Sequence, residues 1–148
     1  MHILYSCHPR IKKFLQARQF KLDERVRLHD PLGFHDYNHL QMNAYCVVSD
    51  SGTLPEESSF FTSVGHPFPA VSNRTSTERP EALDKGCFIL AGISGDGVVQ
   101  AVQTAEAIND NGDLGIPVPN YVEDVSTKVV KIIQSYVGGV NKMVGRMY

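Results

Sequence analysis

Cysteine is scarce in this 148-residue sequence, which contains only Cys7, Cys46 and Cys87. An odd number of cysteines without regular spacing argues against both a disulfide framework and a cysteine metal site. Two of the three fall within or at the end of apolar segments, where a free cysteine behaves as a small hydrophobic residue. We therefore expect buried, reduced thiols. Four histidines also lack acidic or thiol partners at metal-ligand spacing, so no metal is implied: His29, His35, His39 and His66.

Blocks of like charge and long apolar segments are missing as well. Fourteen lysines and arginines stand against sixteen aspartates and glutamates, for a formal net charge of −2. Without a basic block or arm, we expect no nucleic-acid partner. No segment approaches the roughly 20 apolar residues that a membrane-spanning helix needs, so we expect no membrane partner. The segment Met1–Cys7 lacks the charged region and cleavage site of a signal peptide, which favours a cytoplasmic protein.

Short apolar segments alternate with helical patterns along the chain. Five strands are predicted, at Ile3–Ser6, Val26–Leu28, Tyr45–Val48, Ala70–Ser72 and Phe88–Ala91. Helices are predicted at Pro9–Arg18, Phe34–Asn43, Pro55–Ser63 and Arg79–Asp84, and over the helical spacing of Val98 to Ile108. This alternation predicts an α/β fold, a doubly wound parallel sheet, in a single domain of residues 1–148. Ligands of such sheets bind at the carboxyl ends of the strands.

One of these strand ends carries the most informative segment, Ser49–Glu57, with the sequence Ser-Asp-Ser-Gly-Thr-Leu-Pro-Glu-Glu. Small residues allow a phosphate to approach the backbone closely, and the N–H groups that begin a helix bind anions. A carboxylate one turn into that helix can accept hydrogen bonds from sugar hydroxyls. The same residues also suit an ordinary capped helix, with Glu57 only complementing the helix dipole. The spacing alone leaves both interpretations open.

A second segment follows at Arg74–Ala82, with the sequence Arg-Thr-Ser-Thr-Glu-Arg-Pro-Glu-Ala. The two motifs in this order resemble the C-terminal half of the non-hydrolysing UDP-N-acetylglucosamine 2-epimerase family. The Gly-Thr-Leu-Pro form and the Phe60–Phe68 connection are most similar to the branch that makes UDP-N-acetyl-L-fucosamine for surface polysaccharides. The resemblance runs from about Ile3 to the C-terminus. It implies a Rossmann-like C-terminal domain of a glycosyltransferase-B-type two-domain fold.

The resemblance also implies roles for individual residues. Ser51, Gly52 and Thr53 match the turn that contacts the UDP pyrophosphate through backbone N–H and hydroxyl groups. Thr53 replaces a second glycine of other branches, and its hydroxyl adds a donor. Glu57 matches the carboxylate that takes the ribose hydroxyls, and Arg79 an arginine beside the diphosphate.

The resemblance places two further residues at the base. Tyr37 matches an aromatic residue against uracil. Leu32 stands in the loop that edges uracil, where some relatives have a polar side chain, so only its backbone could make that contact. Simpler alternatives remain from the residues alone: Tyr37 as a core aromatic, and Glu78 with Arg79 as a surface ion pair.

The reaction implied is inversion at C2 of a UDP-N-acetylhexosamine, by elimination and re-addition of UDP, with no cofactor. The resemblance implies that the acid and base carboxylates belong to an N-terminal domain, which we expect to be missing from this chain, so the catalytic residues are unknown. We expect this chain to be half of an enzyme, inactive alone, that binds UDP or a UDP-N-acetylhexosamine. Two alternatives stay open: the UDP-sugar-binding half of a glycosyltransferase, and a non-catalytic UDP-binding fragment.

The last segment of the sequence is predicted to be a helix over about residues 125–146. Its apolar residues, from Val129 to Val144, form a wide stripe interrupted by Gly138-Gly139, where a kink is expected. In the family this helix crosses to the N-terminal domain. We therefore expect either a homo-oligomer formed through Ser126–Val144, a separate N-terminal half, or disorder beyond Gly138.

Overall fold

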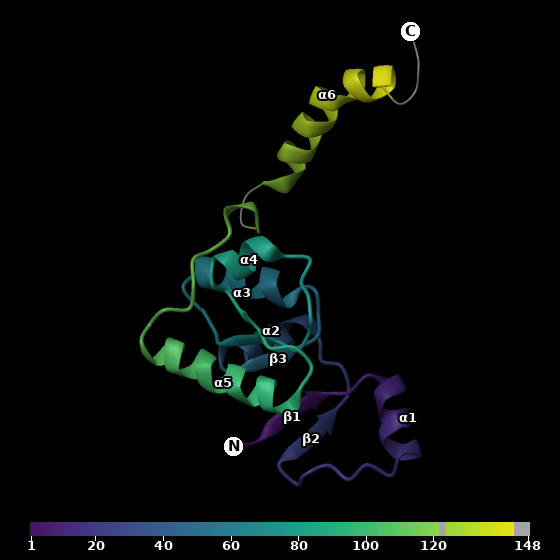
Figure 1. The fold of residues 1–148 in the computed structure, drawn as a ribbon, viewed down its shortest axis with the longest axis vertical. Coiled ribbons are helices and arrows are strands. Elements are labelled where there is room, and N and C mark those ends of the chain that lie inside the picture. Colours follow the sequence, from purple (N-terminus) through teal and green to yellow (C-terminus); the bar gives the residue numbers. More distant parts are fainter. Residues whose placement is uncertain (122–123, 144–148) are drawn as a thin grey trace. The chain divides into compact units, whose positions relative to one another are not determined.

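The structure is a computed structural model and describes residues 1–121 and 124–143. Contacts between residues divide the chain into two compact units, Met1–Asn43 and Ala44–Tyr148. Figure 1 shows the helices and strands of both units. The organisation of residues 1–148 as a single domain stays a prediction.

The unit Met1–Asn43 contains β1 (Ile3–Ser6), α1 (Pro9–Ala17), β2 (Val26–His29) and α2 (Phe34–Met42). The two strands pair in parallel, with Ile3 opposite Val26 and Ser6 opposite His29. Helix α1 begins with a proline, whose fixed φ suits the first helical turn. The side chain of His8 caps this helix, because its Nδ1 accepts a hydrogen bond from the N–H of Arg10 at 3.2 Å. The structure therefore gives His8 a capping role.

The unit Ala44–Tyr148 carries a three-stranded parallel sheet in the order β3-β4-β5. Its elements are β3 (Val47–Ser49), α3 (Leu54–Ser63), β4 (Ala70–Ser72), α4 (Pro80–Asp84), β5 (Ile89–Leu90), α5 (Gly95–Asp110), the 3-10 helix η1 (Pro119–Tyr121) and α6 (Val125–Met143). All strand pairs in the described residues are parallel, and helices connect them. The predicted α/β class is confirmed, although the described strands form two sheets where the sequence predicted one.

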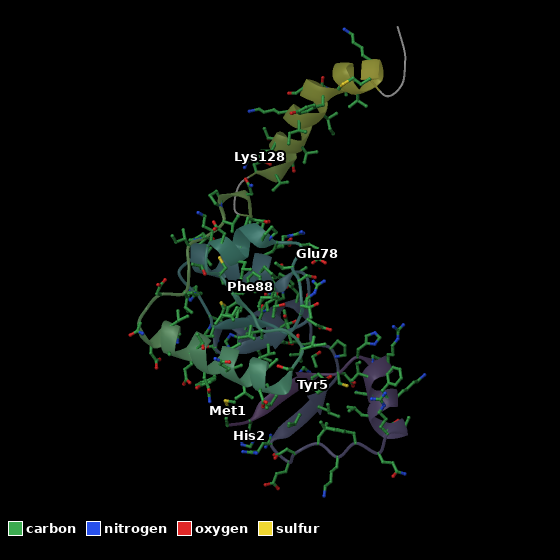
Figure 2. All side chains as sticks on the ribbon, in the orientation of Figure 1. Met1, His2, Tyr5, Glu78, Phe88 and Lys128 are labelled. Atoms are coloured by element: carbon green, nitrogen blue, oxygen red, sulfur yellow. The ribbon has the colours of Figure 1, made fainter. Side chains whose placement is uncertain are left out.

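The β3-β4-β5 sheet has a packed helix on each side (Figure 1). Val71 in the central strand is fully buried and packs against Ala101 and Ala105 of α5. On the α3 side, the rings of Phe61 and Phe68 lie 5.8 Å apart and are buried. The buried apolar groups on both faces hold the sheet between α3 and α5. Because the strands are held, the positions at which the loops leave the strand ends are held as well. Figure 2 shows Glu78, in one of these loops, at the surface of this unit.

Helix α6 presents most of its apolar side chains to solvent. It runs without interruption through Gly138 and Gly139 to Met143, and residues 144–146 of the predicted helix lie outside the described part of the chain. The exposed apolar residues at helical spacing are Val129, Ile132, Ile133, Tyr136, Val137, Val140 and Met143, all between 46% and 80% exposed. Within residues 1–121 and 124–143, no helix has the length and apolar character to cross a membrane.

The three thiols provide a first test of the packing. Cys7 and Cys87 are buried, Cys46 is half-buried, and none forms a disulfide. Burial raises the pKa of the Cys46 thiol to about 11. A raised pKa means less thiolate, so at pH 8 about one Cys46 thiol in a thousand is in the nucleophilic form. We expect iodoacetamide to label Cys46 at pH 8 at least about tenfold more slowly in the native chain than in urea, measured by mass spectrometry of the peptides. Equal rates in both conditions would contradict this packing.

Candidate functional site

The turn between β3 and α3 is built by short polar side chains. Strand β3 ends at Ser49, and α3 begins at Leu54 with a proline in its first turn. The N–H of Ser51 donates to Ser49 Oγ at 3.0 Å, and the N–H of Thr53 donates to Ser51 Oγ at 3.2 Å. Serine hydroxyls commonly fold a turn by bonding the backbone two residues away. The turn is thus held in place by its own side chains.

Gly52, in the middle of this turn, borders an open cleft of about 490 Å³ at the carboxyl ends of β3 and β4. The cleft is lined by Asp50, Gly52, Asn73, Arg74, Thr75, Ser76 and Ile93. A Cβ at position 52 would lie 3.5 Å from Arg74 Nη1 and 3.9 Å from Glu78 Oε2. The lack of a side chain at position 52 therefore keeps the space beside the side chains of Arg74 and Glu78 open. The cleft lies where ligands of parallel sheets bind.

Arg74 and Glu78 form a bidentate ion pair at the edge of this cleft. Arg74 Nη1 donates to Glu78 Oε2 at 2.9 Å, and Nη2 donates to Oε1 at 2.8 Å. The hydrogen bonds from Arg74 hold the pKa of Glu78 below its usual value. Two parallel bonds of this kind fix the plane of the guanidinium. The sequence allows Glu78 as a surface partner of Arg79, but in the structure the Glu78 carboxylate accepts hydrogen bonds from Arg74.

Arg79 is the residue before α4, and its side chain reaches back to Glu56 of α3. Its Nε donates to Glu56 Oε1 at 2.5 Å, and its Nη1 donates to the carbonyl of Glu78 at 3.1 Å. The bond to Glu56 raises the pKa of Arg79, which is therefore a permanent cation. Arg79 and Glu56 are each a little over one-third exposed, so water and ligands can reach both. A guanidinium in this position is suited to an anionic ligand.

A second polar contact adjoins this pair. The hydroxyl of Tyr121, in η1, donates to Glu81 Oε1 of α4. This bond holds the pKa of Glu81 below its usual value, while burial and Glu81 raise the pKa of Tyr121. Tyr121 therefore remains a neutral donor at physiological pH. The contact ties the segment after α5 to the helix that follows Arg79.

Glu57 occupies the first turn of α3 beside Glu56, but it bonds in a different direction. Its Oε1 accepts a hydrogen bond from Thr53 Oγ1 at 2.8 Å, and its N–H donates to the Thr53 carbonyl at 2.9 Å. Glu57 is half-buried and Thr53 is exposed. Of the predicted site residues, Ser51, Gly52, Thr53 and Glu57 therefore lie together around one turn.

The two residues predicted to contact uracil belong to the unit Met1–Asn43. Leu32 lies in the loop between β2 and α2 and is exposed. Tyr37 is half-buried in α2, and its hydroxyl accepts a hydrogen bond from Gln41 Nε2 at 3.0 Å. Their predicted contacts with a base stay predictions.

Sequence reasoning missed Glu56 as the partner of Arg79 and Arg74 as a cleft residue. The Arg74–Glu78 pair has the four-residue spacing that often brings opposite charges together, a usable signal. No comparable signal linked Glu56 to Arg79, because they are 23 residues apart and meet only through the fold. Gly52 of the turn and Arg74 line the cleft, and the carboxylate of Glu57 lies beside the turn.

Comparison with known proteins identifies relatives of the chain. The sequence profile of the family described as UDP-N-acetylglucosamine 2-epimerase matches residues 1–134. A UDP-N-acetylglucosamine 2-epimerase of Methanocaldococcus jannaschii is 30% identical over 105 residues, which are 68% of this chain and 27% of that protein. A UDP-2,3-diacetamido-2,3-dideoxy-D-glucuronate 2-epimerase of Pseudomonas aeruginosa is 29% identical over 114 residues, or 76% of this chain and 30% of that protein.

Solved structures show the same relationship. A UDP-N-acetylglucosamine 2-epimerase from Rickettsia bellii superposes with a TM-score of 0.75 and 36% identity, over 99% of this chain and 40% of that one. The M. jannaschii enzyme in complex with UDP-GlcNAc and UDP gives a TM-score of 0.67 and 25% identity, over 90% of this chain and 36% of that one. The Rossmann-like α/β fold class is confirmed by these structures. The chain thus spans less than half the length of the relatives that it matches. It belongs to the UDP-N-acetylglucosamine 2-epimerase family.

Proposed function

We propose that this chain supplies the UDP-binding half of an isomerase that inverts C2 of a UDP-N-acetylhexosamine. The observation that carries the proposal is the grouping of the Ser51–Thr53 turn, the open cleft at Gly52 and the carboxylate of Glu57 at one strand end. Arg79 adds a fixed cation from the residue that precedes α4. One of the similar proteins supports the ligand, since the M. jannaschii enzyme forms a complex with UDP-GlcNAc and UDP.

Each group has a role in this proposal. The N-terminus of α3 and Arg79 bind the diphosphate, because both offer donors and positive potential to an anion. Glu57 accepts hydrogen bonds from the ribose hydroxyls. That Tyr37 and the backbone of Leu32, in the unit Met1–Asn43, contact uracil stays a prediction.

The proposed reaction eliminates UDP across C1–C2 and adds it back after C2 is protonated on the opposite face. A bound diphosphate is a better leaving group, because cationic and N–H donors stabilise the charge that develops on it. This chain contributes the leaving-group site. The acid and base carboxylates come from the N-terminal domain of the family, and we expect no turnover by these 148 residues alone.

Three further parts of the proposal concern biological context. Thr53 in place of a second glycine, and the Phe60–Phe68 connection, support the UDP-N-acetyl-L-fucosamine branch and with it the synthesis of a surface polysaccharide precursor. We place the chain in the cytoplasm, where nucleotide sugars are made. The exposed apolar residues of α6 support a partner, either a second copy or a separate N-terminal half.

Titration of the full chain with UDP tests the proposed site. We expect weak binding, with a Kd on the order of 0.1–1 mM, because the cleft is open and encloses little of a ligand. Glu57→Ala should weaken binding about tenfold, since hydrogen bonds to a charged group are lost. Glu106→Ala, in α5, is the matched control and should leave the affinity unchanged. Equal binding of UDP and ADP, or an unaltered affinity in the Glu57 variant, would contradict the proposal.

A further inference from the structure

A chain of hydrogen bonds runs through the turn before α3 to the carboxylate of Glu57. The oxygens Ser51 Oγ and Thr53 Oγ1 lie 2.8 Å apart, and Thr53 Oγ1 lies 2.8 Å from Glu57 Oε1. The N–H of Thr53 also donates to Ser51 Oγ. Three side chains predicted to contact ligand are therefore bonded to one another.

The direction of each bond follows from the number of hydrogens available. An ionised carboxylate only accepts, so the single hydroxyl hydrogen of Thr53 goes to Glu57. The Ser51–Thr53 contact then requires the hydrogen of Ser51, which points to Thr53 Oγ1. The Ser51 hydrogen thus points to Thr53 Oγ1, and the Thr53 hydrogen points to Glu57 Oε1. In this arrangement neither hydroxyl has a hydrogen left to donate to a diphosphate.

The backbone conformation of Thr53 directs its hydroxyl toward Glu57. It occupies the residue before α3, where a threonine usually bonds an N–H of the first helical turn. Its backbone angles are already helical, φ −88° and ψ −15°, and its side chain makes no capping bond. Residues four apart on a helix face one another, which brings the hydroxyl to the carboxylate of Glu57.

We propose that Thr53 is a positioning residue, which holds the Glu57 carboxylate in place before a nucleotide binds. The inference rests on the proposed function of Glu57 as the ribose-binding group. A glutamate side chain loses rotamer freedom when it is fixed, and a carboxylate already held by Thr53 loses less on binding. Thr53 therefore acts on the ribose through Glu57, and its hydroxyl is not a diphosphate ligand.

The test compares two nucleotides on the full chain, UDP and 2′,3′-dideoxy-UDP, which lacks the ribose hydroxyls. Thr53→Val removes the hydroxyl and keeps the shape of the side chain. We expect it to weaken UDP binding about fivefold and to leave binding of the dideoxy nucleotide unchanged. Thr53→Ser should bind both nucleotides like the original chain. In a Glu57→Ala background, Thr53→Val should have no further effect on UDP.

Each remaining outcome is decisive. An equal loss for both nucleotides in Thr53→Val means a direct diphosphate contact or a general structural role, and it overturns this inference alone. If Glu57→Ala fails to distinguish the two nucleotides, the ribose assignment fails and the inference fails with it. Thermal unfolding is measured in parallel. If the valine variant is destabilised, Thr53→Ala is titrated in its place, with the same expected difference between the nucleotides.

Discussion

Replacing Arg79 by alanine should weaken UDP binding about ten- to a hundredfold, whereas Glu56→Gln should strengthen it. In the structure, Arg79 Nε lies 2.5 Å from Oε1 of the Glu56 carboxylate. A diphosphate must share the guanidinium with that carboxylate or displace it. Loss of the cation removes charge-assisted hydrogen bonds to the ligand. Loss of the Glu56 charge removes a competitor and a source of repulsion, which should raise the affinity about two- to fivefold.

Calorimetric titration with UDP measures both effects. Lys85→Ala is the matched control, because it removes one exposed cation from the residue after α4, and it should change the affinity less than about twofold. The Arg79–Glu56 pair is partly exposed, so neither variant should lower the melting temperature much. If Glu56→Gln weakens binding as much as Arg79→Ala, Glu56 orients the arginine and does not compete with the ligand.

Glu56 and Glu57 are neighbours in the first turn of α3, but their carboxylates contact different parts of the structure. Both carboxylates lie at the start of α3, where they interact favourably with the positive end of the helix dipole. Because successive residues on a helix point about 100° apart, one meets the segment before α4 and the other meets the turn after β3. The helix thus connects Arg79 and Glu57, the carboxylate that we propose to bind the ribose, to one rigid element.

Much of the fold could be predicted because local patterns mark its elements. Ala70–Ser72 was predicted and observed with the same bounds, and α3 begins one residue before its predicted start at Pro55. A proline at a helix start and a short apolar strand are signals within a few residues. Sheet membership is not local, since it depends on which strands pair. The division of the described strands into two sheets was therefore not predicted.

In the candidate site, too, contacts between close neighbours in sequence could be predicted, whereas contacts between distant residues could not. The turn at Ser51–Thr53 is visible in sequence because its hydrogen bonds span two residues. The neighbours Glu78 and Arg79 suggested an ion pair, yet their side chains take different partners in the structure. Adjacent residues before a helix point in different directions, while the partner of Arg79 arrives from another helix. An ion pair between residues that are distant in sequence, such as Arg79 and Glu56, can be identified only once the fold is known.

Helix α6 leads to the second large expected effect, which concerns association. Its exposed apolar residues recur every three or four positions, from Val129 through Ile133 and Tyr136 to Val140. A stripe of this width on a helix usually packs against another surface. We expect the full chain to form a dimer at micromolar concentration through this helix, and a chain ending at Asp124 to be monomeric. Sedimentation equilibrium measures both.

A pair of single substitutions separates the apolar stripe from the helix itself. Ile133→Glu places a charge inside the stripe and should raise the dimer dissociation constant at least about a hundredfold, because burying an unpaired carboxylate is costly. Gln134→Glu adds the same side chain one residue later, about 100° around the helix and away from the stripe centre. It should leave the dissociation constant within about threefold. A full chain that sediments as a monomer, or equal effects of the two glutamates, would show that α6 does not associate through this stripe.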